Sequence, residues 1–292
     1  MIFDRLIRVL QHLGGETTQP ANSPEVAAPQ SPDTVILEQY VDTPPSVQNA
    51  LDIFAGGWTS KLPEPYADLR SGHLLLFEDT RLEWGLAELG GVTNQRVLEL
   101  GPLECGHSHL LLRHGAASVL AIEANTHAYL KCLIVKDIFG MSNLTLQCGD
   151  FVSFLRQTEE QWDLCVASGV LYHMTNPAEL IALIAKVSKR VYMWTHYYDG
   201  AILAQNPDLA PKFGEQVPSV YADFEHTLYR QNYLAALERK DFCGGSRPHS
   251  MWLSRADLLR CLDHFGFTKV TIAFEEPYHM HGPALSLVAA QA

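Results

Sequence analysis

From Arg96 to the end of the chain, apolar residues fall in short runs separated by amphipathic stretches at helical spacing. This alternation is typical of a mostly parallel sheet that carries helices on both faces. The pattern predicts seven strands, at Val97–Leu100, Ser118–Glu123, Leu144–Cys148, Leu164–Ala167, Arg190–Thr195, Lys269–Phe274 and Leu285–Ala289. We therefore expect an α/β fold built on one open sheet.

The residues before this sheet show two different patterns. Residues 1–45 begin with apolar positions at roughly helical spacing, Met1–Leu13, and continue with proline and small polar residues, so they predict a short helix and a flexible tail. Residues 46–94 are globular in composition and contain the helical run Leu74–Leu89. They predict a helical cap, which leaves residues 95–292 as the core.

Residues 196–250 do not fit the minimal alternation and form an insertion after the fifth predicted strand. The insertion begins at the carboxyl end of the sheet, where ligands bind in open α/β folds. It is rich in aromatic residues and ends in a glycine-rich turn, and the spacing of Leu228, Tyr229, Asn232 and Tyr233 is helical. We expect this segment to be a lid over the substrate.

Charge and cysteine usage narrow the classes of function. The chain has 292 residues and a net charge of −12, which opposes nonspecific binding to nucleic acid or to an anionic membrane. It contains no apolar run long enough to span a bilayer and no secretory signal, and its six cysteines form no C-x-x-C pair. We expect a protein of the reducing cytoplasm.

The turn after the first predicted strand carries the main chemical signal. Gly101 and Gly106 bracket it, but it lacks the middle glycine of a dinucleotide-binding G-x-G-x-x-G motif. Glu99, inside the strand, would repel a phosphate and would suit a ligand with an ammonium group. Glu123, at the end of the next strand, is placed to accept hydrogen bonds from both hydroxyls of an adenosine ribose. S-adenosylmethionine (SAM) has both an ammonium group and an adenosine ribose.

Four segments, ELGPLECGH, IEAN, CGDF and ASGVLYHM, resemble in order and spacing the motifs of class I SAM-dependent methyltransferases. Gly169–His173 and Phe77–Trp84 are most similar to the branch that includes tRNA wobble-uridine carboxymethyl-transferring enzymes. The resemblance implies a Rossmann-like seven-stranded sheet that ends in a pair with one antiparallel strand, with SAM as cofactor. The implied cofactor-binding residues are Glu99, Gly101, Pro102, Gly106, Glu123, Ala124, Asp150, Phe151, Ala167 and Ser168.

Two pairs of these residues, Asp150 with Phe151 and Ala167 with Ser168, are assigned for specific reasons. Asp150 is expected to accept the adenine amino group, with Phe151 beside the ring, but it can equally cap the helix that follows. Ala167 and Ser168 are small, which lets the methionine part of the cofactor meet the acceptor.

The candidate catalytic residues are Tyr172, His173 and His196, which follow the fourth and fifth strands. A histidine can act as a base at neutral pH, although each can equally be a structural hydrogen-bond donor, and many transferases of this fold need no base. The candidate substrate-binding residues are Arg81, Tyr197 and Arg247, and Arg81 has the alternative of an ion pair with Asp79. His279 and His281 have no evident third ligand, so no metal is assigned.

Three functions are compatible with these features. The first is SAM-dependent methyl transfer to an oxygen or nitrogen nucleophile of a small-molecule acceptor. The second is modification of the tRNA wobble uridine, which the net charge disfavours. The third is a catalytically silent module that binds SAM, against which the intact Glu123, Asp150 and Tyr172-His173 argue.

Overall fold

The computed structural model describes residues 40–238 and 243–292, and the chain divides into two units, residues 1–45 and 46–292. The short helix predicted at Met1–Leu13 and most of the predicted tail lie outside the described residues. The described part of the first unit, residues 40–45, is exposed and forms no helix or strand. Within the described residues, no helix combines the length and apolar character needed to cross a bilayer.

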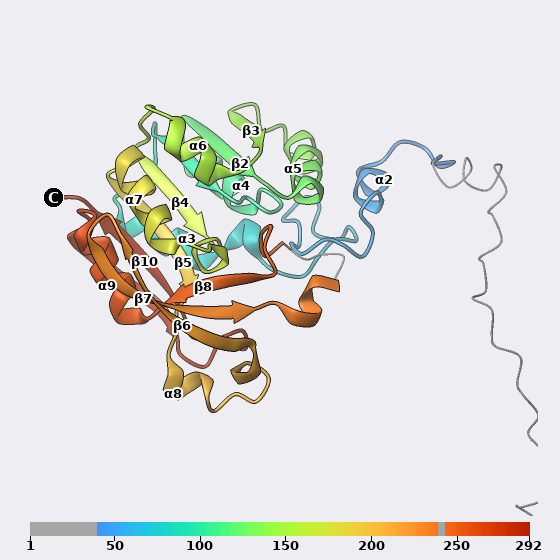
Figure 1. Cartoon of the computed structure of the whole chain (residues 1–292). Helices are drawn as coiled ribbons and strands as arrows, with labels where there is room; N and C mark the ends of the chain where they lie inside the picture. The colour runs from blue at the N-terminus through green and yellow to red at the C-terminus, as the bar shows by residue number, and fades with distance from the viewer. Residues whose placement is uncertain (1–39, 239–242) are drawn as a thin grey trace, which may run out of the picture. The chain divides into compact units, whose positions relative to one another are not determined.

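The larger unit contains the expected seven-stranded sheet, in the order β3-β2-β1-β4-β5-β10-β9. Its strands are β1 (Arg96–Leu100), β2 (Ser118–Glu123), β3 (Leu144–Cys148), β4 (Leu164–Ser168), β5 (Arg190–His196), β9 (Lys269–Glu276) and β10 (Ala284–Ala290). Strand β10 runs antiparallel to both β5 and β9, and the other neighbouring pairs are parallel. The predicted α/β fold, with one antiparallel strand near an edge, is confirmed (Figure 1).

Helices cover both faces of this sheet, and each face has its own apolar cluster. Helices α6 (Phe151–Gln157), α7 (Pro177–Val187) and α9 (Arg255–His264) pack on one face, while α3 (Thr80–Glu88), α4 (Gly106–Arg113) and α5 (Thr126–Ile138) pack on the other. Strand β5 shows why: Val191 and Met193 belong to the first cluster, and Tyr192 between them belongs to the second. Alternate side chains of a strand point to opposite faces.

The segment before the sheet is less helical than the sequence predicts. It contains α2 (Val47–Asp52), a single 3₁₀ turn η2 (Leu76–Glu78) and α3, with turns and extended chain between α2 and η2. The predicted run Leu74–Leu89 is wrong in its first third. Asp79 has an extended backbone and its carboxylate accepts a hydrogen bond from Arg81 N, so it caps a helix that begins only at Thr80.

The inserted segment between β5 and α9 contains a second sheet of three antiparallel strands, β6 (Phe213–Tyr221), β7 (Phe224–Asn232) and β8 (His249–Leu253). It also contains α8 (Gly200–Leu203) and two 3₁₀ turns, η4 (Ala210–Lys212) and η5 (Leu234–Glu238). The helical spacing expected around Leu228 is therefore wrong. Phe224, His226 and Leu228 are buried at alternate positions, which is the period of a strand.

Candidate active site

The turn after β1 adopts a left-handed backbone at three alternate residues. The φ angles of Gly101, Leu103 and Cys105 are 65°, 56° and 59°. Leucine and cysteine rarely take this conformation, because the left-handed backbone has a higher conformational free energy for residues with a Cβ atom than for glycine. The turn therefore adopts, at two non-glycine positions, a backbone conformation that glycine takes most easily.

Two buried carboxylates lie beside this turn, at the ends of neighbouring strands. Glu123 accepts hydrogen bonds from Leu103 N at 3.1 Å and from Asn125 N at 2.8 Å. Glu99 accepts one from Ser108 Oγ. Burial raises the pKa of both carboxyl groups. The hydrogen bonds that they accept act in the opposite direction but do not cancel this effect. A ligand that brings a cation or hydroxyl groups to this place would satisfy both acids.

Glu104, in the same turn, has a different role that the sequence did not reveal. Its carboxylate is fully buried and accepts hydrogen bonds from Thr59 N at 3.0 Å, Ser60 N at 2.7 Å and Lys131 Nζ at 2.9 Å. Lys131 also donates to Gly57 O. Glu104 thus holds the chain before the sheet against α5. The sequence feature that could have predicted this ion pair is an acidic residue in the turn between Gly101 and Gly106 together with a lysine in a mostly apolar helix.

Gly106 owes its identity to packing within the chain. A Cβ atom at this position would lie 2.8 Å from Leu76 C and 2.9 Å from Leu76 O, so only glycine lets η2 approach the start of α4. The turn also packs closely against the loop after β4. A Cβ atom at Gly101 would lie only 2.6 Å from Val170 Cγ1 in that loop. The predicted contacts of both glycines with a cofactor remain predictions.

Asp79, Arg81 and His107 form a hydrogen-bonded cluster close to these acids. The Asp79 carboxylate accepts hydrogen bonds from Arg81 Nε at 2.9 Å, Arg81 Nη2 at 2.7 Å and His107 Nε2 at 2.9 Å. Burial alone would raise the pKa of Asp79, but these partners hold it well below its usual range. The guanidinium lies 4.8 Å from the centre of the Trp194 ring. Arg81 therefore makes the ion pair that was its alternative assignment, and its contact with a substrate stays a prediction.

The three candidate catalytic residues lie together. Tyr172 and His173 form the 3₁₀ turn η3 (Leu171–His173) after β4, and His196 ends β5. The Tyr172 ring centre lies 4.1 Å from that of His173 and 4.6 Å from that of His196. Trp252 in β8 stacks on His196 at 5.2 Å, and the Trp194 ring centre lies 5.0 Å from that of His196. We call these five residues the His-aromatic cluster.

Both histidines of the cluster are neutral at physiological pH. Burial, together with the nearby His196, lowers the pKa of His173 to about 3. Burial and the neighbouring His279 lower that of His196 to about 4, although His196 Nδ1 donates a hydrogen bond to Gly282 O at 2.8 Å. Burial raises the pKa of Tyr172 above its usual range, so this side chain keeps its proton.

Three other candidates lie outside the cluster. Asp150 caps α6 by accepting hydrogen bonds from Val152 N and Ser153 N, both at 3.1 Å, which is its alternative role. Tyr197 packs in the apolar cluster on the α7 and α9 face, and its hydroxyl donates to Glu275 Oε1 at 3.2 Å. Arg247 is exposed. The contacts of Tyr197 and Arg247 with a substrate remain predictions.

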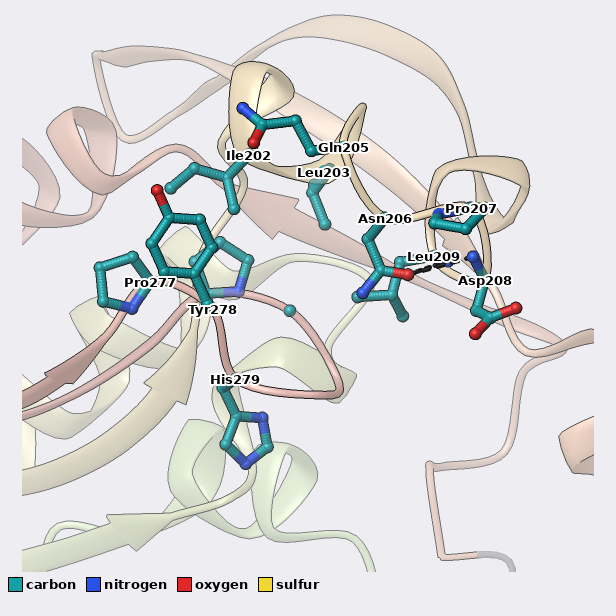
Figure 2. Close-up of a pocket in the computed structure, with 12 residues that line it drawn as sticks. Ile202, Leu203, Gln205, Asn206, Pro207, Asp208, Leu209, Pro277, Tyr278 and His279 are labelled. Atoms are coloured by element: carbon teal, nitrogen blue, oxygen red, sulfur yellow. Dashed lines mark hydrogen bonds between the residues drawn. The ribbon is translucent and has the colours of Figure 1, made fainter.

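A pocket of about 420 Å³ lies between the loop that follows α8 and the loop 277–283 between β9 and β10 (Figure 2). Gln205, Asn206, Asp208 and Tyr278 line it together with apolar residues. His279 also lines it, and its ring lies 5.1 Å from that of His196. The pocket therefore borders the His-aromatic cluster.

Comparison with solved structures shows a similar fold in proteins solved with S-adenosylhomocysteine, one of them a known methyltransferase. The N-terminal domain of EvdMO1, solved with S-adenosylhomocysteine (SAH) and D-fucose, is similar with a TM-score of 0.62 and 20% sequence identity, over 84% of this chain and 96% of that domain. Magnesium protoporphyrin IX methyltransferase (ChlM) from Synechocystis PCC 6803, solved with SAH, gives a TM-score of 0.50 and 13% identity over 85% of this chain and 100% of that one.

No protein-family model and no curated protein matches the sequence. At identities of 20% and below, the solved structures establish the class I methyltransferase fold. They do not support the tRNA wobble-uridine branch that the sequence resembles.

Proposed function

We propose that this protein is a SAM-dependent methyltransferase that acts on an oxygen or nitrogen nucleophile of a small molecule. The observation that carries the proposal is the pair of buried acids, Glu99 and Glu123, beside the left-handed turn at the carboxyl ends of β1 and β2. In open α/β folds, ligands bind at this end of the sheet.

The residues around the turn fit SAM. A buried carboxylate needs a cationic or hydrogen-bonding partner, and the two acids would repel a phosphate. Glu123 would accept hydrogen bonds from the ribose hydroxyls, and Glu99 would face the methionine ammonium. Ala167 and Ser168, which are small, would lie at the methionine part of the cofactor, and Asp150 and Phe151 would lie at the adenine. When bound, SAM supplies a methyl group activated on a sulfonium.

His173 and His196 can take up a proton from the acceptor. Their pKa values of about 3 and about 4 keep both imidazoles unprotonated at neutral pH. His196 Nδ1 donates to a carbonyl oxygen, Gly282 O, so Nε2 carries the lone pair. An acceptor hydroxyl that reaches this nitrogen can give up its proton as the new bond forms. An acceptor nitrogen has to react as a neutral amine, because an ammonium has no lone pair. The rings of Tyr172, Trp194 and Trp252 all contact the His196 ring, which is buried.

The size of the neighbouring pocket favours a small acceptor. A volume of about 420 Å³ is within the range of small-molecule sites, and its walls combine amide, carboxylate and aromatic groups. The net charge of −12 opposes binding of RNA. The EvdMO1 domain, which has a similar fold, was solved in the presence of D-fucose, and this is compatible with a small-molecule ligand here.

Native mass spectrometry of the purified protein, followed by transfer from labelled SAM, tests the proposal. We expect retained SAM or SAH, and label in a metabolite extract that does not depend on salt. Label confined to an RNA pool and lost at high salt would replace the small-molecule proposal with the tRNA alternative. Bound cofactor with no label in either pool would favour the silent module.

A further inference from the structure

The hydroxyl of Tyr233, in the lid, bridges two groups. It lies 2.5 Å from Gly244 O and 2.9 Å from His173 Nδ1. A carbonyl oxygen only accepts hydrogen bonds, so the single proton of the Tyr233 hydroxyl points to Gly244 O. The bond to His173 must then be donated by Nδ1–H to the tyrosine oxygen.

This direction fixes the tautomer of His173. A neutral imidazole carries one proton, and the low pKa of about 3 keeps this ring neutral. With the proton on Nδ1, the lone pair is on Nε2. His196 has the same arrangement through Gly282 O, so both histidines of the His-aromatic cluster present Nε2 as the basic nitrogen.

We propose that Tyr233 is a positioning residue that sets the tautomer of His173 for proton uptake during methyl transfer. This inference rests on the proposed function. Tyr233 does not itself need to touch the acceptor, because it acts through the ring of His173. It performs the task that a carboxylate or carbonyl performs behind other catalytic histidines, which is to hold Nδ1–H and orient the ring.

Two further contacts hold the bridge in place. Tyr233 is 6% exposed, and its backbone N–H donates to Pro248 O at 3.1 Å at the start of β8. In β8 itself, Met251 N donates to Met174 O at 2.8 Å, and Met174 directly follows His173. The inserted segment is therefore joined to the loop after β4 at His173, through the Tyr233 hydroxyl, and at the next residue, Met174.

Nuclear magnetic resonance of protein labelled with ¹⁵N-histidine tests the tautomer without cofactor or acceptor. The His173 signals are identified by their loss in His173→Gln. In the wild type we expect one neutral form with the proton on Nδ1, and in Tyr233→Phe a mixture of both tautomers. A wild-type proton on Nε2, or a tautomer unchanged in Tyr233→Phe, would overturn the proposal.

Kinetics give a second, independent readout. We expect Tyr233→Phe to lower kcat at least about tenfold, less than the about 10²–10⁴-fold of a placed base itself because Tyr233 acts through His173, with the KM for SAM unchanged. In a His173→Gln background the same change should have no further effect, because the two residues act as one unit. Additive losses would indicate a purely structural role and refute the proposal.

Tyr229→Phe is the matched control, since Tyr229 lies in β7, four residues before Tyr233, and stacks on Tyr198 at 3.6 Å instead. It should leave kcat and the His173 signals unchanged, and a loss equal to that of Tyr233→Phe would contradict the proposal. If the wild type transfers no methyl group from SAM, the proposed function fails, while the resonance experiment still decides the tautomer.

Discussion

Lys131 Nζ lies 2.9 Å from Glu104 Oε1, and the two side chains are 9% and 0% exposed. The lysine belongs to α5 and the glutamate to the turn after β1, 27 residues earlier. Because Glu104 also binds Thr59 N and Ser60 N, this buried ion pair joins the chain before the sheet to the turn that faces the proposed cofactor.

Lys131→Met should therefore destabilise the protein strongly. It leaves a buried carboxylate without its cation, a change that costs about 3–5 kcal/mol in free energy of unfolding. Urea denaturation followed by circular dichroism measures it. The control is Asp52→Ala, which breaks the pair between Asp52 and Arg70 at 39% and 77% exposure and should cost less than about 1 kcal/mol. Equal losses in the two variants would show that the buried pair is not an important source of stability.

Glu123→Ala should weaken SAM binding by at least about tenfold. Each hydrogen bond from a ribose hydroxyl to a charged acceptor contributes roughly 1.5–3 kcal/mol, and 1.4 kcal/mol corresponds to about a factor of ten. Isothermal titration calorimetry with SAM and with SAH measures the affinity. Glu160→Ala, at the exposed ion pair with Arg96, is the control and should bind like the wild type. An unchanged affinity in Glu123→Ala would remove this residue from the proposed site.

Stability should fall as the pH falls from about 6.5 to about 4. Burial lowers the pKa of His109 and of His196 to about 4 in the folded protein, from an ordinary value of 6.5. In this window the unfolded chain binds protons that the folded protein does not, so acid favours unfolding. The stabilising effect is fully present above pH 6.5.

His196→Gln removes one of these groups and should make the decline with pH shallower. Urea denaturation at several pH values between 4.5 and 7 gives the slope. Parallel curves for the variant and the wild type would mean that the pKa of His196 is the same in the folded and unfolded states.

Gly85→Ala should destabilise the packing of α3 on the sheet. A Cβ at Gly85 would lie 2.4 Å from Tyr192 Cδ2 and 3.3 Å from Val288 Cγ1, and the Tyr192 side chain is fully buried. Overpacking of this kind costs about 1–3 kcal/mol. Thermal denaturation compares it with Gly149→Ala, where a Cβ meets nothing within 4 Å. If both variants melt together, Tyr192 has room to move and the contact is not tight.

The sequence by itself determined the central sheet, because a strand needs only a local pattern. The bounds of β2 and β3 agree with the predicted runs residue for residue, and the other five strands differ by at most two residues at an end. Short apolar runs that alternate with amphipathic helical stretches predict a sheet with helices on both faces, because the strands must be buried on both sides. The placement of Glu99 and Glu123 at the ends of β1 and β2 follows from the same runs.

The tertiary structure decided which distant residues meet. His173 and Tyr233 are 60 residues apart, and His107 and Asp79 are 28 apart, so no local spacing connects them. The lid shows the same limit: a few apolar residues fit a helix and a strand equally, and only pairing between β6, β7 and β8 selects the strand. Side-chain roles that depend on such contacts, from the Glu104–Lys131 pair to the tautomer of His173, exist only in the folded chain.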